Sequence, residues 1–395
     1  MPNPTQLFDS KPPATRPSEI PALTHAAVLG AGAWGTALAC ALQRSGVSTR
    51  LWARRAALAE TICSRLQNPQ HLPGIDLPAG LDASPDMAQA VAGAQLVILA
   101  VPSVAMRDIV RQVAGLLAPG TLVLTASKGI EQDSGALMTQ VLDEELNPAV
   151  LTGSIGGPSF ADEVARGQST LLTLAMPALE RRHHQHAKAQ RIAASLLQQL
   201  AFADVTLELT PDAIGAQVGG ALKNMIAIAC GMAVAQGMGE NARAGIITRG
   251  LDDMRRLNQA LGGRMETLLG SSGVGDLFLT AASEHSRNTR LGMRLGRPGA
   301  EAADAVDELA EGAVSVMSVQ ILERELGLRL NVAAAVRDVL QQRLTAERAL
   351  QRLLHDSAPS LQPQVARTRP QTMRPRPGRE IEQRPAAQAW LLGYA

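Results

Sequence analysis

A glycine-rich turn between a short apolar run and a helical pattern constrains this 395-residue chain more than any other feature. The apolar run His25–Leu29 leads directly into Gly30-Ala-Gly-Ala-Trp-Gly35, which has the form G-x-G-x-x-G. In such a turn Gly30 permits the tight bend, Gly32 lets a pyrophosphate approach the backbone, and Gly35 lets the helix pack against the strand. Free N–H groups at the helix start favour phosphates. The context predicts a dinucleotide-binding turn, and a turn without a ligand is the alternative.

Short apolar runs alternate with helical patterns over the first half of the chain. Strands are expected at His25–Leu29, Ser48–Trp52, Leu96–Val101, Thr121–Ala126, Val150–Ile155, Thr170–Ala175 and Val205–Leu209. From about Pro211 to Asp356 the strand signals vanish and Ala/Leu/Met-rich helical patterns continue. The order predicts an α/β fold, with a doubly wound, mostly parallel sheet over residues 22–209 and an all-α domain over residues 210–356.

The two ends of the chain differ from the middle. Residues 1–21 are Pro-rich and lack hydrophobic periodicity, so we expect a disordered leader. Residues 357–395 are rich in Pro and Arg, and we expect a solvated, disordered tail. A tail that docks on a partner is the alternative.

Charge and composition limit the class of protein. The chain has 37 Lys plus Arg and 36 Asp plus Glu, and the net charge of +1 argues against a nucleic-acid binder. Aromatic residues make up only 2%, so we expect an aliphatic core. Three cysteines without a CxxC pair fit a reducing compartment. The chain lacks a run of about 18 apolar residues and a secretory signal pattern, so we expect no membrane insertion.

The end of the second expected strand carries basic residues where an acid usually binds the ribose 2′-OH of NAD. The sequence there is Leu51-Trp-Ala-Arg54-Arg55. The two arginines can form charge-assisted bonds with a 2′-phosphate. We therefore expect NADP(H) to be favoured and NAD(H) to be possible. The alternative is that Arg54 and Arg55 only begin a solvated loop.

Two further strand ends carry candidate ligand-binding residues. A strand is expected at Thr121–Ala126, and Ser127 and Lys128 follow it directly. Lys128 should therefore face a ligand beyond the carboxyl edge of the sheet. Gly156-Gly157-Pro-Ser159-Phe follows the next strand and predicts a tight turn close to a ligand. An ordinary exposed lysine and a plain turn are the alternatives.

The strongest chemical signal is a lysine inside an apolar helix. The segment Ile214–Val234 is apolar almost all round and should form a buried helix, yet Lys223 and Asn224 lie in its middle. An unpaired buried ammonium is costly, so Lys223 should face a cavity, a partner or a ligand. Small residues such as Gly219 and Gly220 would leave room for a substrate beside it. Burial should lower its pKa toward values useful for proton transfer. A snorkelling structural lysine is the alternative.

Three more segments of the second domain contain candidate site residues. Asp276 lies in a Gly-rich turn, and Ser286-Arg287-Asn288 marks a helix start that can bind a phosphate. A simple N-cap with a surface arginine is the alternative. Glu311-Gly312 could return an acid to the cofactor. The cluster His183, His184 and His186 lies in a charged stretch, where we expect a solvated surface and no metal site.

Eleven motifs together resemble those of a known family. They are Gly30-Ala-Gly-Ala-Trp-Gly-Thr-Ala-Leu-Ala, Leu51-Trp, His71-Leu-Pro-Gly, Ala100-Val-Pro-Ser, Ser127-Lys-Gly-Ile-Glu, Gly157-Pro-Ser-Phe-Ala, Ile214-Gly-Ala-Gln-Val-Gly-Gly-Ala-Leu-Lys-Asn, Gly239-Glu-Asn-Ala-Arg-Ala, Thr248-Arg-Gly, Gly275-Asp-Leu and Ser286-Arg-Asn. In this order they resemble the bacterial NAD(P)-dependent glycerol-3-phosphate dehydrogenases over roughly residues 25–350.

The resemblance implies a Rossmann-type domain followed by an all-α substrate domain. It implies reversible reduction of dihydroxyacetone phosphate to sn-glycerol 3-phosphate in the cytoplasm, for glycerophospholipid synthesis. Lys223 would be the general acid in reduction and the base in reverse, and Lys128 would help to polarise the carbonyl. Substrate contacts would come from Lys128, Gly157, Ser159, Lys223, Asp276, Ser286, Arg287 and Asn288. With the glycine turn and the two arginines, the cofactor set would be Gly30, Gly32, Ala33, Trp34, Gly35, Arg54, Arg55, Lys128, Ala161, Arg287, Leu309 and Glu311.

The chain departs from the family pattern after Glu311-Gly312, where Ala313–Val316 replaces a more polar segment. This puts the contribution of that loop to cofactor binding in doubt. A 3-hydroxyacid or ketoacid dehydrogenase of the same architecture is one alternative function, and a non-catalytic dinucleotide-binding redox sensor is another. The partner is expected to be a small molecule, and the apolar helices make a homodimer plausible.

Overall fold

The computed structural model describes residues 22–283, 285–297, 299 and 311–355. The expectations for residues 1–21, residues 357–395 and Leu309 lie outside these residues. The elements of the first part are β1 (His25–Leu29), α1 (Ala33–Arg44), β2 (Ser48–Trp52), α2 (Ala56–Arg65), β3 (Gln67–Asn68), β4 (Leu72–Asp76), β5 (Asp82–Ser84), α3 (Met87–Val91), β6 (Leu96–Leu99), η3 (Ser103–Ala105), α4 (Met106–Ala114), β7 (Leu122–Thr125), α5 (Met138–Glu145), β8 (Leu151–Gly156), α6 (Ala161–Ala165), β9 (Thr170–Ala175), η4 (Pro177–Leu179), α7 (His186–Ala201) and β10 (Val205–Thr210).

The second part of the described chain is helical. Its elements are α8 (Ala213–Ala235), α9 (Glu240–Leu261), α10 (Met265–Leu269), the π-helical turn η5 (Ser271–Gly275), α11 (Asp276–Ala282), α12 (Arg287–Leu295), α13 (Glu311–Leu326), α14 (Asn331–Leu340) and α15 (Ala346–His355). All seven strands expected from the sequence form. The strand expected at Leu96–Val101 ends early, at Leu99, and the Val101-Pro102 segment follows it outside the sheet. The strands β3, β4 and β5 are additional.

The eight strands of the main sheet are ordered β10-β9-β8-β7-β6-β1-β2-β5, and β3 and β4 form a separate hairpin. Every neighbouring pair is parallel except β8 and β9, so β9 and β10 run opposite to the rest. The prediction of a mostly parallel sheet is confirmed. The carboxyl ends of β1, β6, β7 and β8 meet at one edge, where α/β folds bind ligands.

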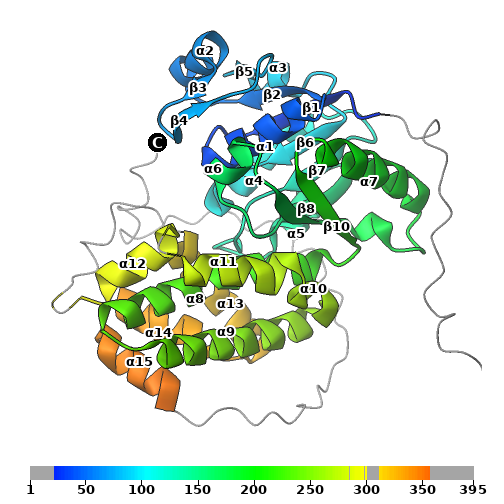
Figure 1. Ribbon diagram of the computed structural model, residues 1–395. Coiled ribbons are helices and arrows are strands. Elements are labelled where there is room, and N and C mark those ends of the chain that lie inside the picture. The colour runs from blue at the N-terminus through cyan, green and yellow to red at the C-terminus, as the bar shows by residue number, and fades with distance from the viewer. Residues whose placement is uncertain (1–21, 284, 298, 300–310, 356–395) are drawn as a thin grey trace, which may run out of the picture. The chain divides into compact units, whose positions relative to one another are not determined.

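Helices cover both faces of the sheet, as expected for a doubly wound fold (Figure 1). On one face Val28, Ile98 and Leu124 pack with side chains of α1 and α7. On the other face the alternate residues Leu29 and Val97 pack with α4 and α5. Residues on both faces are therefore buried, which explains why these strands are continuous apolar runs.

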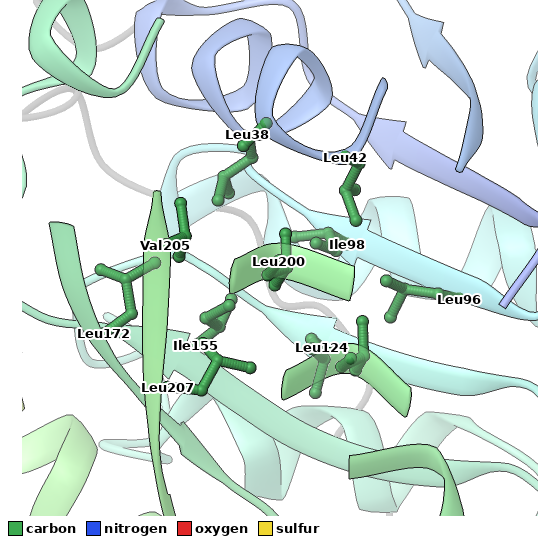
Figure 2. Close-up of a pocket in the computed structure, with 12 residues that line it drawn as sticks. Leu38, Leu42, Leu96, Ile98, Leu124, Ile155, Leu172, Leu200, Val205 and Leu207 are labelled. Atoms are coloured by element: carbon green, nitrogen blue, oxygen red, sulfur yellow. The ribbon is translucent and has the colours of Figure 1, made fainter. Parts of the chain in front are cut away.

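The core beneath α1 and α7 is aliphatic. Figure 2 shows Leu38 and Leu42 of α1 above Ile98 and Ile155 of the sheet, with Leu200 of α7 beside Ile98. The low aromatic content is consistent with this core. Trp52 lies on the other side of the sheet, 8% exposed, and its Nε1 donates a hydrogen bond to the Pro85 carbonyl. This tryptophan therefore contributes to packing.

Helix α8 forms the centre of the helical domain, and α9, α11, α12, α13 and α14 pack around it (Figure 1). Glycines allow the closest crossing: a Cβ on Gly231 would lie 2.1 Å from the Thr289 carbonyl oxygen, and one on Gly292 would lie 2.0 Å from that of Ile228. Among the described helices, only α8 is long and apolar enough to cross a membrane, and 89% of its most apolar window is buried. Its apolar sequence is therefore explained by its central position.

Candidate active site

The glycine-rich turn has the geometry of a phosphate cradle. Gly30 has φ +118°, and a Cβ there would lie 2.5 Å from the Ala100 carbonyl oxygen. A Cβ on Gly35 would lie 1.9 Å from the Gly30 carbonyl oxygen, so the start of α1 packs tightly on β1. A Cβ on Gly32 would meet nothing within 4 Å. The approach to the backbone at Gly32 is therefore open, as a pyrophosphate requires.

The start of α1 presents hydrogen-bond donors that no side chain of the described residues accepts from. Its N-cap, Gly32, has no side chain to accept from the first N–H groups. The indole Nε1 of Trp34 is buried and has no hydrogen-bond partner among the described residues. An acceptor anion beside this turn would satisfy these groups. Ala33 is half-buried beside Trp34 and packs on the core below. The turn therefore fits the phosphates of a dinucleotide.

Asn68 of the short strand β3 supports the cradle from outside. This residue is 0% exposed, and its Nδ2 donates to the Ala31 carbonyl (2.9 Å) and to Thr36 Oγ1 (2.8 Å). Its Oδ1 accepts from the His71 N–H at 3.3 Å. Asn68 was not expected from the sequence, although it lies three residues before the His71-Leu-Pro-Gly motif.

The rim beyond β2 is basic. Arg54 and Arg55 are exposed after the strand, and Arg55 donates a hydrogen bond to Gln70 Oε1. Burial lowers the pKa of His71, and the positive charges of Arg55 and Arg287 lower the pKa further. The structure thus brings an arginine of each domain close enough to act on one imidazole.

A buried carboxylate shared by two lysines lies at the carboxyl ends of β7 and β8. Asp276, only 1% exposed, accepts from Lys223 Nζ at 2.5 Å through Oδ1 and from Lys128 Nζ at 2.8 Å through Oδ2. Lys128 also donates to the Gly157 carbonyl at 3.1 Å. Lys223, 6% exposed, also donates to Thr280 Oγ1 at 2.9 Å. Two helices of the helical domain, α8 and α11, and two loops of the sheet domain therefore converge here.

Burial makes the ammonium of Lys223 unusually acidic. Loss of water lowers its pKa to about 8, with Asp276 opposing this shift and the nearby charge of Lys128 adding to it. The ordinary lysine pKa is about 10.4. The amine therefore titrates in a range useful for proton transfer, as burial in the apolar helix suggested.

Helix α8 is fixed at its start and along its length. Asp212 caps the helix by accepting from the Gly215 N–H (2.9 Å), and its other oxygen accepts from the Arg264 N–H (2.8 Å). Gln217 exchanges two hydrogen bonds with Thr139 of α5, one from the Thr139 N–H (3.0 Å) and one to its Oγ1 (2.7 Å). The bonds of Gln217 therefore fix the helix that carries Lys223 against the sheet domain, and those of Asp212 fix its first turn.

The expected reason for the small residues beside Lys223 is wrong. A Cβ on Gly219 would lie 2.6 Å from Gly273 Cα, so the space beside it is filled by the η5 backbone. A Cβ on Gly220 would lie 3.4 Å from the Lys128 side chain. The glycines thus allow η5 and Lys128 to approach α8, and they do not leave a substrate-sized gap.

Other expected site residues take part in internal contacts. Ser286 Oγ accepts from the Thr289 N–H at 3.3 Å, so it caps α12 as predicted. Asn288 is buried, and its Oδ1 accepts from the Gly312 N–H at 3.1 Å, which joins α12 to the start of α13. Arg287 between them is exposed. Ser159 Oγ donates to the Gly157 carbonyl at 3.0 Å.

Two of the remaining residues expected to bind the cofactor, Ala161 and Glu311, each begin a helix. Ala161 begins α6 and packs on the core beside α1. Glu311 begins α13, and its side chain is not among the described groups. The atypical segment Ala313–Val316 lies in the first turns of this helix, where Val316 is 0% exposed. Its apolar residues are therefore explained by packing in the helical domain.

Two features of the lysine site were not expected from the sequence. Thr280 follows Asp276 by one helical turn on α11, a spacing that places both on one face. Asp276 was expected among the substrate-binding residues, whereas the structure shows it as the shared partner of both lysines. Among the described residues, no group of three His, Cys, Asp or Glu side chains is arranged to hold a metal ion.

A dinucleotide turn on a doubly wound sheet, together with a buried lysine of lowered pKa in a following helical domain, is typical of two-domain oxidoreductases that use a nicotinamide cofactor. Comparison with known proteins specifies the family. The model described as NAD-dependent glycerol-3-phosphate dehydrogenase N-terminus matches residues 25–182, and the corresponding C-terminus model matches residues 212–351. The chain belongs to this family.

Relatives and solved structures agree. A glycerol-3-phosphate dehydrogenase, NAD(P)+, of Xanthomonas campestris is 40% identical over 331 residues, which are 83% of this chain and 94% of the relative. One of Stenotrophomonas maltophilia is 42% identical with the same coverage. The crystal structure of glycerol-3-phosphate dehydrogenase from Coxiella burnetii is similar with a TM-score of 0.77 and 32% identity, and it covers 85% of this chain and 100% of that chain.

The two lysines should depend on Asp276 for stability. We expect Asp276→Asn to lower the free energy of unfolding by about 3–5 kcal/mol near pH 7, because Lys223 must then either stay charged without its counter-ion or give up its proton on folding. The loss should shrink above pH 8, where Lys223 is neutral. The double variant Asp276→Asn/Lys223→Met should recover part of the stability. Urea unfolding of the three proteins measures this.

Asp162→Asn is the control, because Asp162 pairs with Arg166 at the surface and its side chain is 53% exposed. Its effect should stay within about 1 kcal/mol. An Asp276→Asn variant as stable as this control would show that the buried carboxylate does not compensate the lysines.

Proposed function

We propose that this protein catalyses the reversible NAD(P)H-dependent reduction of dihydroxyacetone phosphate to sn-glycerol 3-phosphate. The observation that carries the proposal is the Lys223–Asp276–Lys128 arrangement at the sheet edge that bears the dinucleotide turn. Membership of the glycerol-3-phosphate dehydrogenase family supports it. A bound nicotinamide supplies the hydride in reduction and accepts it in the reverse direction.

The residues of the chain hold and move the proton. Lys223, protonated below about pH 8, gives a proton from Nζ to the C2 oxygen of the ketone and takes one back from the alcohol in reverse. Lys128 presents a second positive charge that polarises the same carbonyl. Asp276 keeps both ammonium groups in place, and Thr280 adds a hydrogen bond that orients Lys223.

The substrate phosphate meets the start of α12. Ser286 and Asn288 fix the first turn of this helix, and Arg287 supplies a positive charge beside its free N–H groups. Gly157 and Ser159 complete the substrate site from the sheet domain. A phosphate explains this group better than the carboxylate of a 3-hydroxyacid or ketoacid does, and a dinucleotide-binding redox sensor would not need an acidic buried lysine.

Residues 22–209 bind the cofactor in this proposal, and residues 210–356 contribute most of the substrate site. Gly30, Gly32, Ala33, Trp34 and Gly35 hold the pyrophosphate, with Ala161, Lys128, Arg287, Leu309 and Glu311 completing the cofactor site. Arg54 and Arg55 favour the 2′-phosphate of NADP(H) over NAD(H). We further propose that the enzyme works in the cytoplasm as a homodimer and that its product, sn-glycerol 3-phosphate, is used for glycerophospholipid synthesis.

Removal of the Lys223 amine tests the mechanism. We expect dihydroxyacetone phosphate to oxidise NADPH in the presence of the protein, and we expect Lys223→Ala to reduce kcat by about 10²–10⁴-fold because the general acid is lost. Cofactor binding, measured by fluorescence titration, should persist. Lys188→Ala on α7 is the matched control and should retain full activity. Near-normal turnover in Lys223→Ala would refute the assigned role, and turnover of a 3-hydroxyacid alone would favour the alternative enzyme.

Removal of Arg54 tests the cofactor preference. Because a 2′-phosphate carries charge that the ribose hydroxyl lacks, Arg54→Ala should raise the Kd of NADPH by about tenfold and that of NADH by less than about twofold. Arg65→Ala, at the far end of the ten-residue helix α2, removes the same charge and should leave the ratio unchanged. Equal weakening of both cofactors by Arg54→Ala would contradict the preference.

A further inference from the structure

The turn that delivers Asp276 is fastened to the edge of the sheet. This turn, η5, begins at Ser271, whose N–H and Oγ both donate to Glu208 Oε2 on β10, at 3.1 and 2.7 Å. Ser271 Oγ also lies 2.7 Å from Thr173 Oγ1 on β9, which accepts from the Ser272 N–H at 3.2 Å. Both strands therefore hold the first two residues of the turn.

The two strand residues lie side by side in the sheet. Glu208 pairs in register with Thr173, and Thr173 pairs in turn with Gly156 of β8. Gly157 follows directly, and its carbonyl accepts from Lys128. Three residues paired side by side across the sheet, Glu208, Thr173 and Gly156, thus support η5 and precede the carbonyl that Lys128 contacts. The reversed direction of β9 and β10 brings the middle of these strands to the carboxyl end of β8.

The turn is confined on its other side by α8. Ser271 and Ser272 are 6% and 2% exposed, and Gly273 lies against Gly219, where no Cβ could be accommodated. In the described part of the chain, the Glu208 carboxylate accepts hydrogen bonds from Ser271 alone. These bonds are charge-assisted and therefore stronger than bonds between neutral groups. A π-helical turn is itself an uncommon conformation, and such turns are frequent at functional sites.

We propose that Glu208 and Thr173 are positioning residues for the reaction: they anchor η5 so that the Asp276 carboxylate stays between Lys223 and Lys128. Neither residue touches the substrate in this proposal, which rests on the proposed role of Lys223. The charged groups that act on Lys223 are Asp276 from α11 and Lys128 from the loop after β7. If the anchor is lost, Asp276 no longer opposes the effect of burial, and Lys223 loses its proton at lower pH.

The experiment compares Glu208→Ala, Glu208→Gln and Thr173→Val in the full-length protein, by the pH dependence of dihydroxyacetone phosphate reduction and by thermal melting. We expect Glu208→Ala to lower kcat about tenfold at pH 7.5, with KM for the ketone changed less than about twofold. Its rate should begin to fall at lower pH than that of the wild type. Glu208→Gln keeps an acceptor oxygen and should recover most of the activity. Thr173→Val should act like Glu208→Ala but more weakly.

Glu180→Ala is the matched control, because Glu180 also joins the sheet domain to the segment before α10, through Arg264, without touching η5. It should leave kcat and the pH profile unchanged. Wild-type kcat in Glu208→Ala and Thr173→Val, or a loss without a shift of the pH profile, would overturn the proposal. If Glu208→Ala does not fold, Thr173→Val decides the outcome. An active Lys223→Ala variant would instead refute the proposed function, so the two failures are distinguishable.

Discussion

The sharing of one buried carboxylate by two lysines is the interaction on which the site depends. Asp276 compensates Lys223 from the centre of an apolar helix and Lys128 from the edge of the sheet. Burial alone would make the Lys223 ammonium too unstable to stay protonated near neutral pH, whereas a fully compensated ion pair would make it too weak an acid. The opposing effects of burial and Asp276 set the pKa of Lys223 at about 8. The same carboxylate is also one of the contacts between the two domains, since Lys128 belongs to the sheet domain and Asp276 to the helical domain.

The fold provides this arrangement through close backbone contacts. The glycine turn at Gly30 and the crossing of α8 with η5 at Gly219 both exclude a side chain. The reversal between β8 and β9 places Thr173 where it can hold η5. The aliphatic cores on both faces of the sheet then keep the strand ends, and hence Lys128, in a fixed position. Residues that do not take part in the reaction, such as Gly219 and Thr173, therefore help to position Asp276.

Much of the fold could be predicted because the central strands are apolar on both faces and the glycine turn has a distinctive spacing. Strands β3 and β5 were missed because they are only two and three residues long and carry polar residues such as Asn68 and Asp82. Strand β4 was missed because Pro73 and Gly74 interrupt its apolar pattern. Lys223 was recognisable because an ammonium in an apolar helix demands an explanation. Its partner was not recognisable, because Asp276 lies 53 residues away along the chain, and Lys128 lies 148 residues from it. Such contacts depend on tertiary packing, which local pattern does not encode.

The pH dependence of kcat/KM for dihydroxyacetone phosphate tests the central claim most directly, since this ratio reports the ionisation of the free enzyme. For the wild type, kcat/KM should be constant at lower pH and fall above about pH 8, as Lys223 loses its proton. In Asp276→Asn the fall should move to lower pH, because the carboxylate that raises the pKa of Lys223 is gone. A fall at the same pH in both proteins, or at higher pH in Asp276→Asn, would contradict the claim that Asp276 keeps the general acid protonated.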